Sequence, residues 1–194
     1  MKKIIIGLII VLCLTGCNSL MNSPTKKVEN MLSKYQTNDE IVLNQLDETL
    51  LTDAIMLPEQ KERYKDIMKK QYQDLMYTIK DEAIDGKTAI VEVEIEVYDY
   101  AKAVTNTEND LINNSDNYKD TTGDINTTMY NDMKLTNLEN MKDRVKYTIN
   151  FTLSKVDEEW IVDDLTETER MKIHGLYAYW FNIIGKIYYY NKNK

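Results

Sequence analysis

Apolar residues recur every three or four positions in three segments of the first third of the chain. This spacing predicts helices within residues 22–36, 39–51 and 58–77. Ser23 can cap the first helix, and Pro24 suits its first turn. One side of the second helix is expected to carry Ile41, Val42, Gln45 and Leu46. The stripe of the third helix is interpreted as core rather than as an aromatic ligand site, and it comprises Tyr64, Ile67, Met68, Tyr72 and Leu75.

The period then changes from 3.6 to 2, which is typical of strands. Residues 77–100 are predicted to form a hairpin, with Asp85-Gly86 at its turn. Val91, Val93, Ile95 and Val97 alternate with Glu92, Glu94 and Glu96. We expect the valines and the isoleucine to be buried, and the glutamates to lie on a solvated face rather than to bind metal.

A second hairpin is predicted over residues 144–165, with its turn at Val156 to Glu159. Its inward positions are Tyr147, Ile149, Phe151, Leu153, Trp160 and Val162. Between the hairpins, residues 102–128 are rich in Asn, Asp and Thr, so we expect a polar surface excursion with a short helix near Asp110 to Asn114. Its acids lack the order of an EF-hand calcium loop. Residues 129–143 are predicted to form a further helix.

The last 30 residues begin with a capping box, formed by Thr166 and Glu169. Ile173, Tyr177, Trp180 and Ile184 can then share one helical face. Polar residues and two glycines interrupt this segment too often for a membrane span. Tyr188 to Tyr190 are expected to pack back on the domain, and contact with the membrane or the cell wall is the alternative.

The N-terminus has the layout of a signal peptide. Lys2 and Lys3 precede an apolar run over residues 4–14, which is too short to span a bilayer. The sequence Leu-Thr-Gly-Cys at Leu14–Cys17 resembles the lipobox of bacterial lipoproteins, in which the cysteine receives a diacylglycerol and the peptide is cut just before it. The resemblance implies a signal peptide over residues 1–16, a lipid on Cys17 and a tether over residues 17–23. A chance Cys after an ordinary signal peptide is the alternative.

Composition and charge narrow the function classes. The chain has 194 residues and a net charge of −8, which argues against nucleic acid as a partner. Loss of Lys2 and Lys3 with the signal peptide lowers the net charge to −10. Cys13 leaves as well and Cys17 would be acylated, so we expect no disulfide and no thiolate metal site. The Lys, Asn and Ile content of the chain suggests that it comes from a bacterium with an AT-rich genome, of the Gram-positive kind.

Several helices followed by hairpins with one buried face predict an α+β fold. The segments over residues 23–35, 84–100 and 145–177 resemble a mostly uncharacterised family of lipobox-bearing bacterial proteins with an NTF2-like (cystatin-like) domain. The resemblance implies one domain over residues 24–187, in which N-terminal helices pack on a curved antiparallel sheet built from two hairpins and form a cone, followed by a tail over residues 188–194. Candidate cone-lining residues are Tyr147, Phe151, Trp160, Val93 and Ile95.

No catalytic constellation, metal site or cofactor motif stands out. His174 is the only imidazole and has no nucleophile elbow elsewhere in the sequence to serve. We therefore expect a non-catalytic binding or interaction module on the extracytoplasmic side of the cell membrane. Its partner would be a surface protein, a wall polymer or an apolar ligand. The alternatives are an NTF2-like enzyme or carrier for a small hydrophobic molecule, with polar groups from helices such as Tyr64, Tyr72 or Asp66, and a structural spacer.

Overall fold

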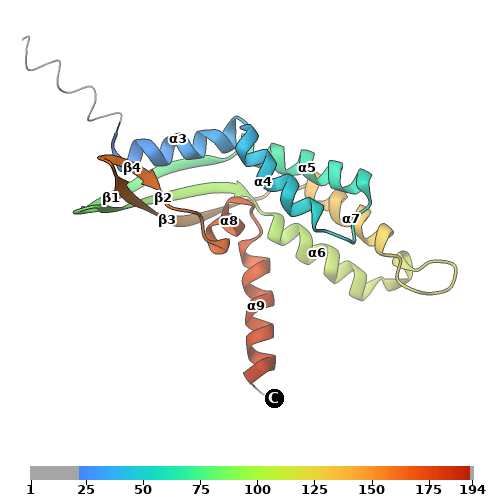
Figure 1. Cartoon of the computed structure of the whole chain (residues 1–194). Helices are drawn as coiled ribbons and strands as arrows, with labels where there is room; N and C mark the ends of the chain where they lie inside the picture. Colours follow the sequence, from blue (N-terminus) through green and yellow to red (C-terminus); the bar gives the residue numbers. More distant parts are fainter. Residues whose placement is uncertain (1–21, 193–194) are drawn as a thin grey trace, which may run out of the picture. The chain divides into compact units, whose positions relative to one another are not determined.

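The structure is a computed structural model that describes residues 22–192, with side chains described as far as Ile184. Within this part of the chain it is an α+β protein with seven α-helices and four strands (Figure 1). The elements, in chain order, are α3 (Pro24–Gln36), α4 (Glu40–Leu51), α5 (Pro58–Gln73), β1 (Met76–Asp85), β2 (Thr88–Tyr98), α6 (Tyr100–Asn113), the 3-10 helix η1 (Ser115–Tyr118), α7 (Thr127–Glu139), β3 (Arg144–Val156), β4 (Glu159–Val162), α8 (Glu167–Ile173) and α9 (Tyr177–Lys192).

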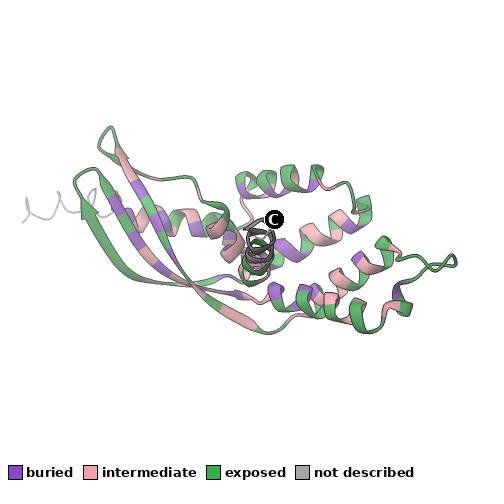
Figure 2. Ribbon diagram, turned by 90° about the horizontal axis from the view of Figure 1, so that it is seen from below, coloured by how far each residue is buried: buried purple, intermediate pink, exposed green. Residues whose placement is uncertain are grey.

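The strands form one sheet in the order β1-β2-β3-β4. Both hairpin predictions are confirmed. Gly86 turns the first with φ 60°, and Asp157 and Glu158 turn the second with φ 47° and 66°. Along β2 and β3 the buried positions recur at every second residue, as the alternating pattern predicts (Figure 2).

The contacts group the chain into two units. The first unit contains the described residues up to Ser33 and residues 78–94 and 148–164, and the second contains residues 34–77 and 95–147 and the described residues from Leu165 onward. One domain over residues 24–187 stays a prediction.

In the first unit, α3 lies along the strands and buries Val28 and Leu32 completely (Figure 1). Its start is held by Glu82, whose Oε2 accepts hydrogen bonds from the backbone N–H and the hydroxyl of Thr25 at 2.8 and 2.7 Å. A carboxylate at this position also interacts favourably with the positive end of the helix dipole. Sequence pattern and electrostatics therefore agree on where the helix begins.

In the second unit, the end of β2 is fixed by helix α5 and by a glycine. The amide of Gln71 on α5 donates to the carbonyl of Tyr98 at 3.1 Å and accepts from its N–H at 2.9 Å. Gly175 lies against the same strand end, with φ 72°. A Cβ atom there would come within 2.1 Å of the Tyr98 carbonyl oxygen, so only glycine fits.

Two expectations about the second unit need correction. Residues 102–128 are not mainly a surface excursion, because α6 covers their first half and buries Ala103, Val104 and Thr107. These three residues are one, three and four positions apart, so they lie on one face of the helix, which begins after its N-cap Asp99. The many polar residues around them hid this helical pattern in the sequence. Ile41 is 56 % exposed, since α4 buries Val42, Leu46 and Leu50 instead.

The C-terminal segment is also different from the expectation of one shared face. Its capping box is confirmed, because Thr166 and Glu169 bond each other reciprocally. However, α8 ends at Ile173, and the positive φ of Gly175 separates it from α9. Ile173 is buried while Ile184 is 44 % exposed. The backbone is helical through Lys192, and the side chains of Tyr188–Tyr190 lie outside the described part.

Candidate functional site

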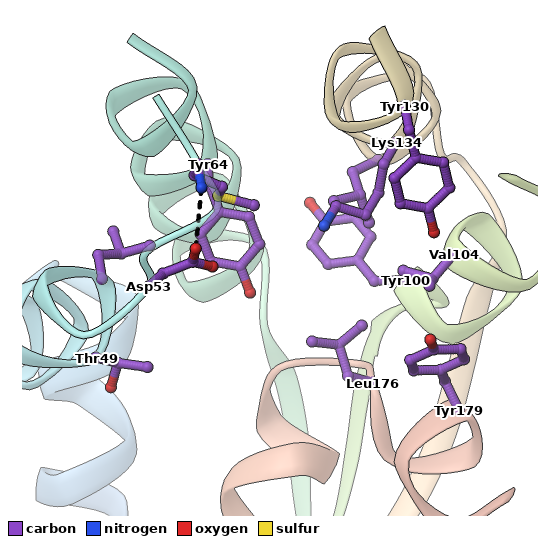
Figure 3. Close-up of a pocket in the computed structure, with 12 residues that line it drawn as sticks. Thr49, Asp53, Tyr64, Tyr100, Val104, Tyr130, Lys134, Leu176 and Tyr179 are labelled. Carbon is purple, nitrogen blue, oxygen red and sulfur yellow. Dashed lines mark hydrogen bonds between the residues drawn. The ribbon is translucent and has the colours of Figure 1, made fainter. Parts of the chain in front are cut away.

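A cavity of about 270 Å³ lies among the helices of the second unit. Its walls come from α4 and the loop after it, from α5, α6 and α7, from the segment that joins α8 to α9, and from the first turn of α9. Figure 3 shows side chains around an open space, with Thr49, Asp53 and Tyr64 on one side and Lys134 reaching in from the other. The volume is close to the lower end of the range of about 300–1,000 Å³ that is usual for small-molecule sites.

Lys134 supplies the positive charge of the cavity. It follows Tyr130 by one turn of α7, and its Nζ lies 5.8 Å from the centre of that ring, which is a cation–π distance. Burial lowers the pKa of Lys134, and the charges of Asp53 and Glu108 oppose this shift only in part. Within residues 22–192, no carboxylate oxygen lies within the 4.0 Å of an ion pair with Nζ. The amine is a partly desolvated charge that an anionic ligand would compensate.

Four tyrosines give the cavity most of its aromatic surface: Tyr64, Tyr100, Tyr130 and Tyr179. Burial raises the pKa of each phenol, and that of Tyr64 reaches about 12, so all four are neutral at pH 7. The hydroxyl of Tyr100 donates to the carbonyl of Ile67 at 3.3 Å, and that of Tyr179 donates to Glu108. These two rings are therefore held in place as walls.

Asp53 supplies the negative charge on the opposite side. Its Oδ1 accepts the backbone N–H groups of Ile55 at 2.8 Å and Met56 at 3.0 Å. The bond from Met56 contributes most to holding the pKa of Asp53 below its usual range, and the charges of Lys134 and Lys61 add to it. The cavity therefore has one anionic and one cationic end, joined by aromatic rings.

A smaller cavity of about 50 Å³ lies beside His174 in the same unit. The Nε2 atom of His174 lies 3.0 Å from the hydroxyl of Tyr72. Burial, followed by the charge of Arg170, lowers the pKa of His174 to about 4. At pH 7 this imidazole is therefore neutral, and it is paired with the Tyr72 hydroxyl.

The candidate cone-lining residues lie elsewhere. Val93 and Ile95 are fully buried, and Phe151 and Trp160 are exposed by 1 % and 6 %. Tyr147 is half-buried, and its ring meets Tyr177 edge-on at 5.5 Å. None of these five residues lines the 270 Å³ cavity. Their role in a cone stays a prediction, and Cys17 lies outside the described residues.

Of the three helical residues considered for an enzyme, only Tyr64 lines the larger cavity. Tyr72 faces the smaller one, and Asp66 is an exposed partner of Lys69. Sequence reasoning missed Lys134 and Asp53, which lie 81 positions apart in the chain. The available signal was local: Tyr130 and Lys134 are spaced by four on a helix, which places a ring and a cation on one side.

Two of the three glutamates of β2 form ion pairs with basic residues. Glu94 lies 3.4 Å from Lys80, and Glu96 lies 3.1 Å from Arg144. All three glutamates are half-buried, so the solvated face that we expected is partly covered. Across the described range 22–192, no group of three or more His, Cys, Asp or Glu side chains is placed to hold a metal ion.

The N-terminus gives the decisive comparison. Residues 1–18 match the family model of the prokaryotic membrane lipoprotein lipid attachment site. The protein is a lipid-anchored membrane lipoprotein. No curated protein and no solved structure matches the chain. Among the helices that the structure describes, none has both the length and the apolar character needed to cross a bilayer.

Proposed function

We propose that this lipoprotein is a non-catalytic binding protein that holds a small molecule in the 270 Å³ cavity on the extracytoplasmic side of the membrane. The ligand has a mainly apolar, ring-shaped body. An anionic group such as a carboxylate faces Lys134, and a hydrogen-bond donor or cation faces Asp53. The observation that carries this proposal is the partly desolvated amine of Lys134, which faces a tyrosine-lined cavity and has no ion-pair partner among the described residues.

The two charges define the expected selectivity. The amine of Lys134 has lost part of its hydration on burial. A ligand carboxylate would compensate for this loss by accepting a charge-assisted hydrogen bond from the amine. A second carboxylate would meet Asp53, whose depressed pKa keeps it ionised at neutral pH. Dianions are therefore disfavoured, and so are long wall polymers, because the cavity admits only a small group. The carrier form of the alternative function would use the same cavity.

The anchor and the fold complete the proposal. Cys17 is the proposed lipid acceptor: it ends the Leu-Thr-Gly-Cys sequence, and the match of residues 1–18 to a lipid attachment site supports this assignment. The order of elements supports an NTF2-like domain over residues 24–187: helices come first, then a hairpin, two helices and a second hairpin. The anchor supports exposure at the cell surface, and the amino-acid composition supports a Gram-positive source.

Calorimetric titration of the detergent-solubilised lipoprotein tests the site with three probes of one ring type: 4-hydroxyphenylacetate, tyramine and L-tyrosine. The carboxylate probes should bind, and Lys134→Gln should weaken them by about 10- to 100-fold. This is the range for the loss of a hydrogen bond to a charged group, worth about 1.5–3 kcal/mol. Tyramine lacks the carboxylate, so Lys134→Gln should leave its affinity nearly unchanged.

Two matched variants separate the charges. Lys142→Gln removes an exposed lysine outside the cavity and should change no affinity. Asp53→Asn should weaken tyramine and L-tyrosine more than 4-hydroxyphenylacetate. Equal binding of 4-hydroxyphenylacetate to the Lys134→Gln variant and the unaltered protein would overturn the proposal. Failure of all three probes to bind would overturn it as well.

A further inference from the structure

The C-terminal helix α9 differs in composition from the rest of this acidic chain. From Tyr177 to Lys194 the sequence has seven aromatic residues, three lysines and no Asp or Glu. The chain as a whole has a net charge of −8. A segment that is both aromatic and basic is typical of helices that lie in a membrane interface.

The start of α9 is packed against the second unit, whereas its next turns expose apolar side chains. Tyr179 is tied to Glu108 by its hydroxyl, and Tyr177 contacts Tyr147. Beyond them, Phe181, Ile183 and Ile184 are exposed by 58 %, 37 % and 44 %. Figure 1 shows α9 leaving the neighbouring helix α6 of the same unit after its first turns. A rigid attachment therefore presents an apolar surface to the surroundings.

The lipid anchor determines what surrounds this surface, because it keeps the protein at a bilayer. Tyrosine and tryptophan favour the headgroup region, where an apolar ring and a polar group are both satisfied. Lysines attract anionic headgroups, and the remainder of the acidic chain would be repelled by them. Since no described helix can span the membrane, α9 would lie in the interface.

We propose that α9 is an interfacial helix that inserts Trp180, Phe181 and Ile184 into the headgroup region of the membrane holding the lipid anchor. The occupant of this apolar surface is thus the bilayer. The helix orients the second unit on the membrane, a role that the acyl chains alone cannot supply because they attach only at the N-terminal end. This inference does not depend on a ligand in the cavity.

Fluorescence of Trp180 tests the insertion. The chain has two tryptophans, and Trp160→Phe leaves Trp180 as the reporter. The acylated protein is reconstituted into vesicles of phosphatidylcholine and phosphatidylglycerol, with and without brominated acyl chains. Insertion predicts a blue-shifted emission that brominated lipid quenches. Replacing both Phe181 and Ile184 by Ser should remove the shift and the quenching. Ile112→Ser, at a residue of α6 that is 75 % exposed, should leave both unchanged.

Three outcomes would overturn the inference. The first is no quenching of Trp180 by brominated lipid, and the second is the same quenching in the double serine variant as in the protein that keeps Phe181 and Ile184. The third is quenching of Trp180 that becomes weaker as the amount of protein per vesicle rises. The last result would mean that a second copy covers the helix. Circular dichroism confirms that each variant is folded. If Trp160→Phe fails to fold, the difference between the unaltered protein and a Trp180→Phe variant gives the same signal.

Discussion

At the scale of single residues, burial shifts the pKa of a histidine and of several tyrosines in the second unit. His174 is the clearest case, because desolvation and the Arg170 charge act in the same direction and bring its pKa to about 4. Its Nε2 meets the Tyr72 hydroxyl, whose own pKa burial raises well above the usual value. The pair is therefore neutral at pH 7, and protonation of the imidazole opposes folding.

The pH dependence of stability follows from this shift. The unfolded imidazole titrates near 6.5 and the folded one near 4. The stabilisation from a neutral His174 is fully present above about pH 6.5 and is lost as the pH falls toward 4. Urea unfolding should show a decrease of up to about 3 kcal/mol over this window. His174→Gln removes the titration, and an unchanged pH slope in that variant would contradict the assignment.

At the scale of elements, Gln71 connects helix α5 to the end of strand β2. Gln71 is fully buried, and its amide bonds both backbone groups of Tyr98. Gln71→Met keeps the shape but leaves an N–H and a carbonyl without partners, so we expect a loss of about 2–4 kcal/mol in the free energy of unfolding. Gln73→Met, at an exposed position of the same helix, should cost less than about 0.5 kcal/mol. Equal costs would show that the pairing contributes nothing.

Elements with a regular apolar period were predictable, and those that depend on tertiary packing were not. The alternation in β2 and most of the stripe of α5 follow from local spacing: the structure buries the apolar residues of β2 from Val91 to Val97, and it buries Ile67, Met68 and Tyr72 of α5. Helix α6 was hidden because only Tyr100, Val104 and small residues mark its buried face among many Asn, Asp and Thr. The break at Gly175 depends on how close Tyr98 lies, which no local pattern records.

The candidate site was less predictable than the fold. Tyr64 was recognised as part of an apolar stripe, but its place in a cavity depends on α6 and α7. Asp53 and Lys134 face the same space only after four helices have packed. Their charges carry the proposed selectivity, so the chemistry of the site arises from tertiary structure. A search of the sequence for catalytic motifs could not have found it.

At the scale of the whole molecule, attachment to the membrane must overcome the charge of the protein. The chain has a net charge of −8 and is repelled by anionic lipid, so we expect the acyl chains of the lipid anchor to supply the main holding force. A helix in the interface orients the protein on the membrane. It binds the membrane reversibly, so it cannot anchor the protein in place of two acyl chains. High salt should therefore not release the protein, whereas loss of the lipidated cysteine should prevent stable anchoring after processing.

Metabolic labelling with palmitate checks this last prediction. The unaltered protein should incorporate label, stay in the membrane fraction in 1 M salt (where the Debye length is about 3 Å) and migrate without residues 1–16. Cys17→Ala should incorporate no label and keep its signal peptide, since cleavage follows lipid transfer. Cys13→Ala is the matched control, because that residue lies within the removed segment and its loss should change nothing. Continued labelling of Cys17→Ala would place the lipid on another residue.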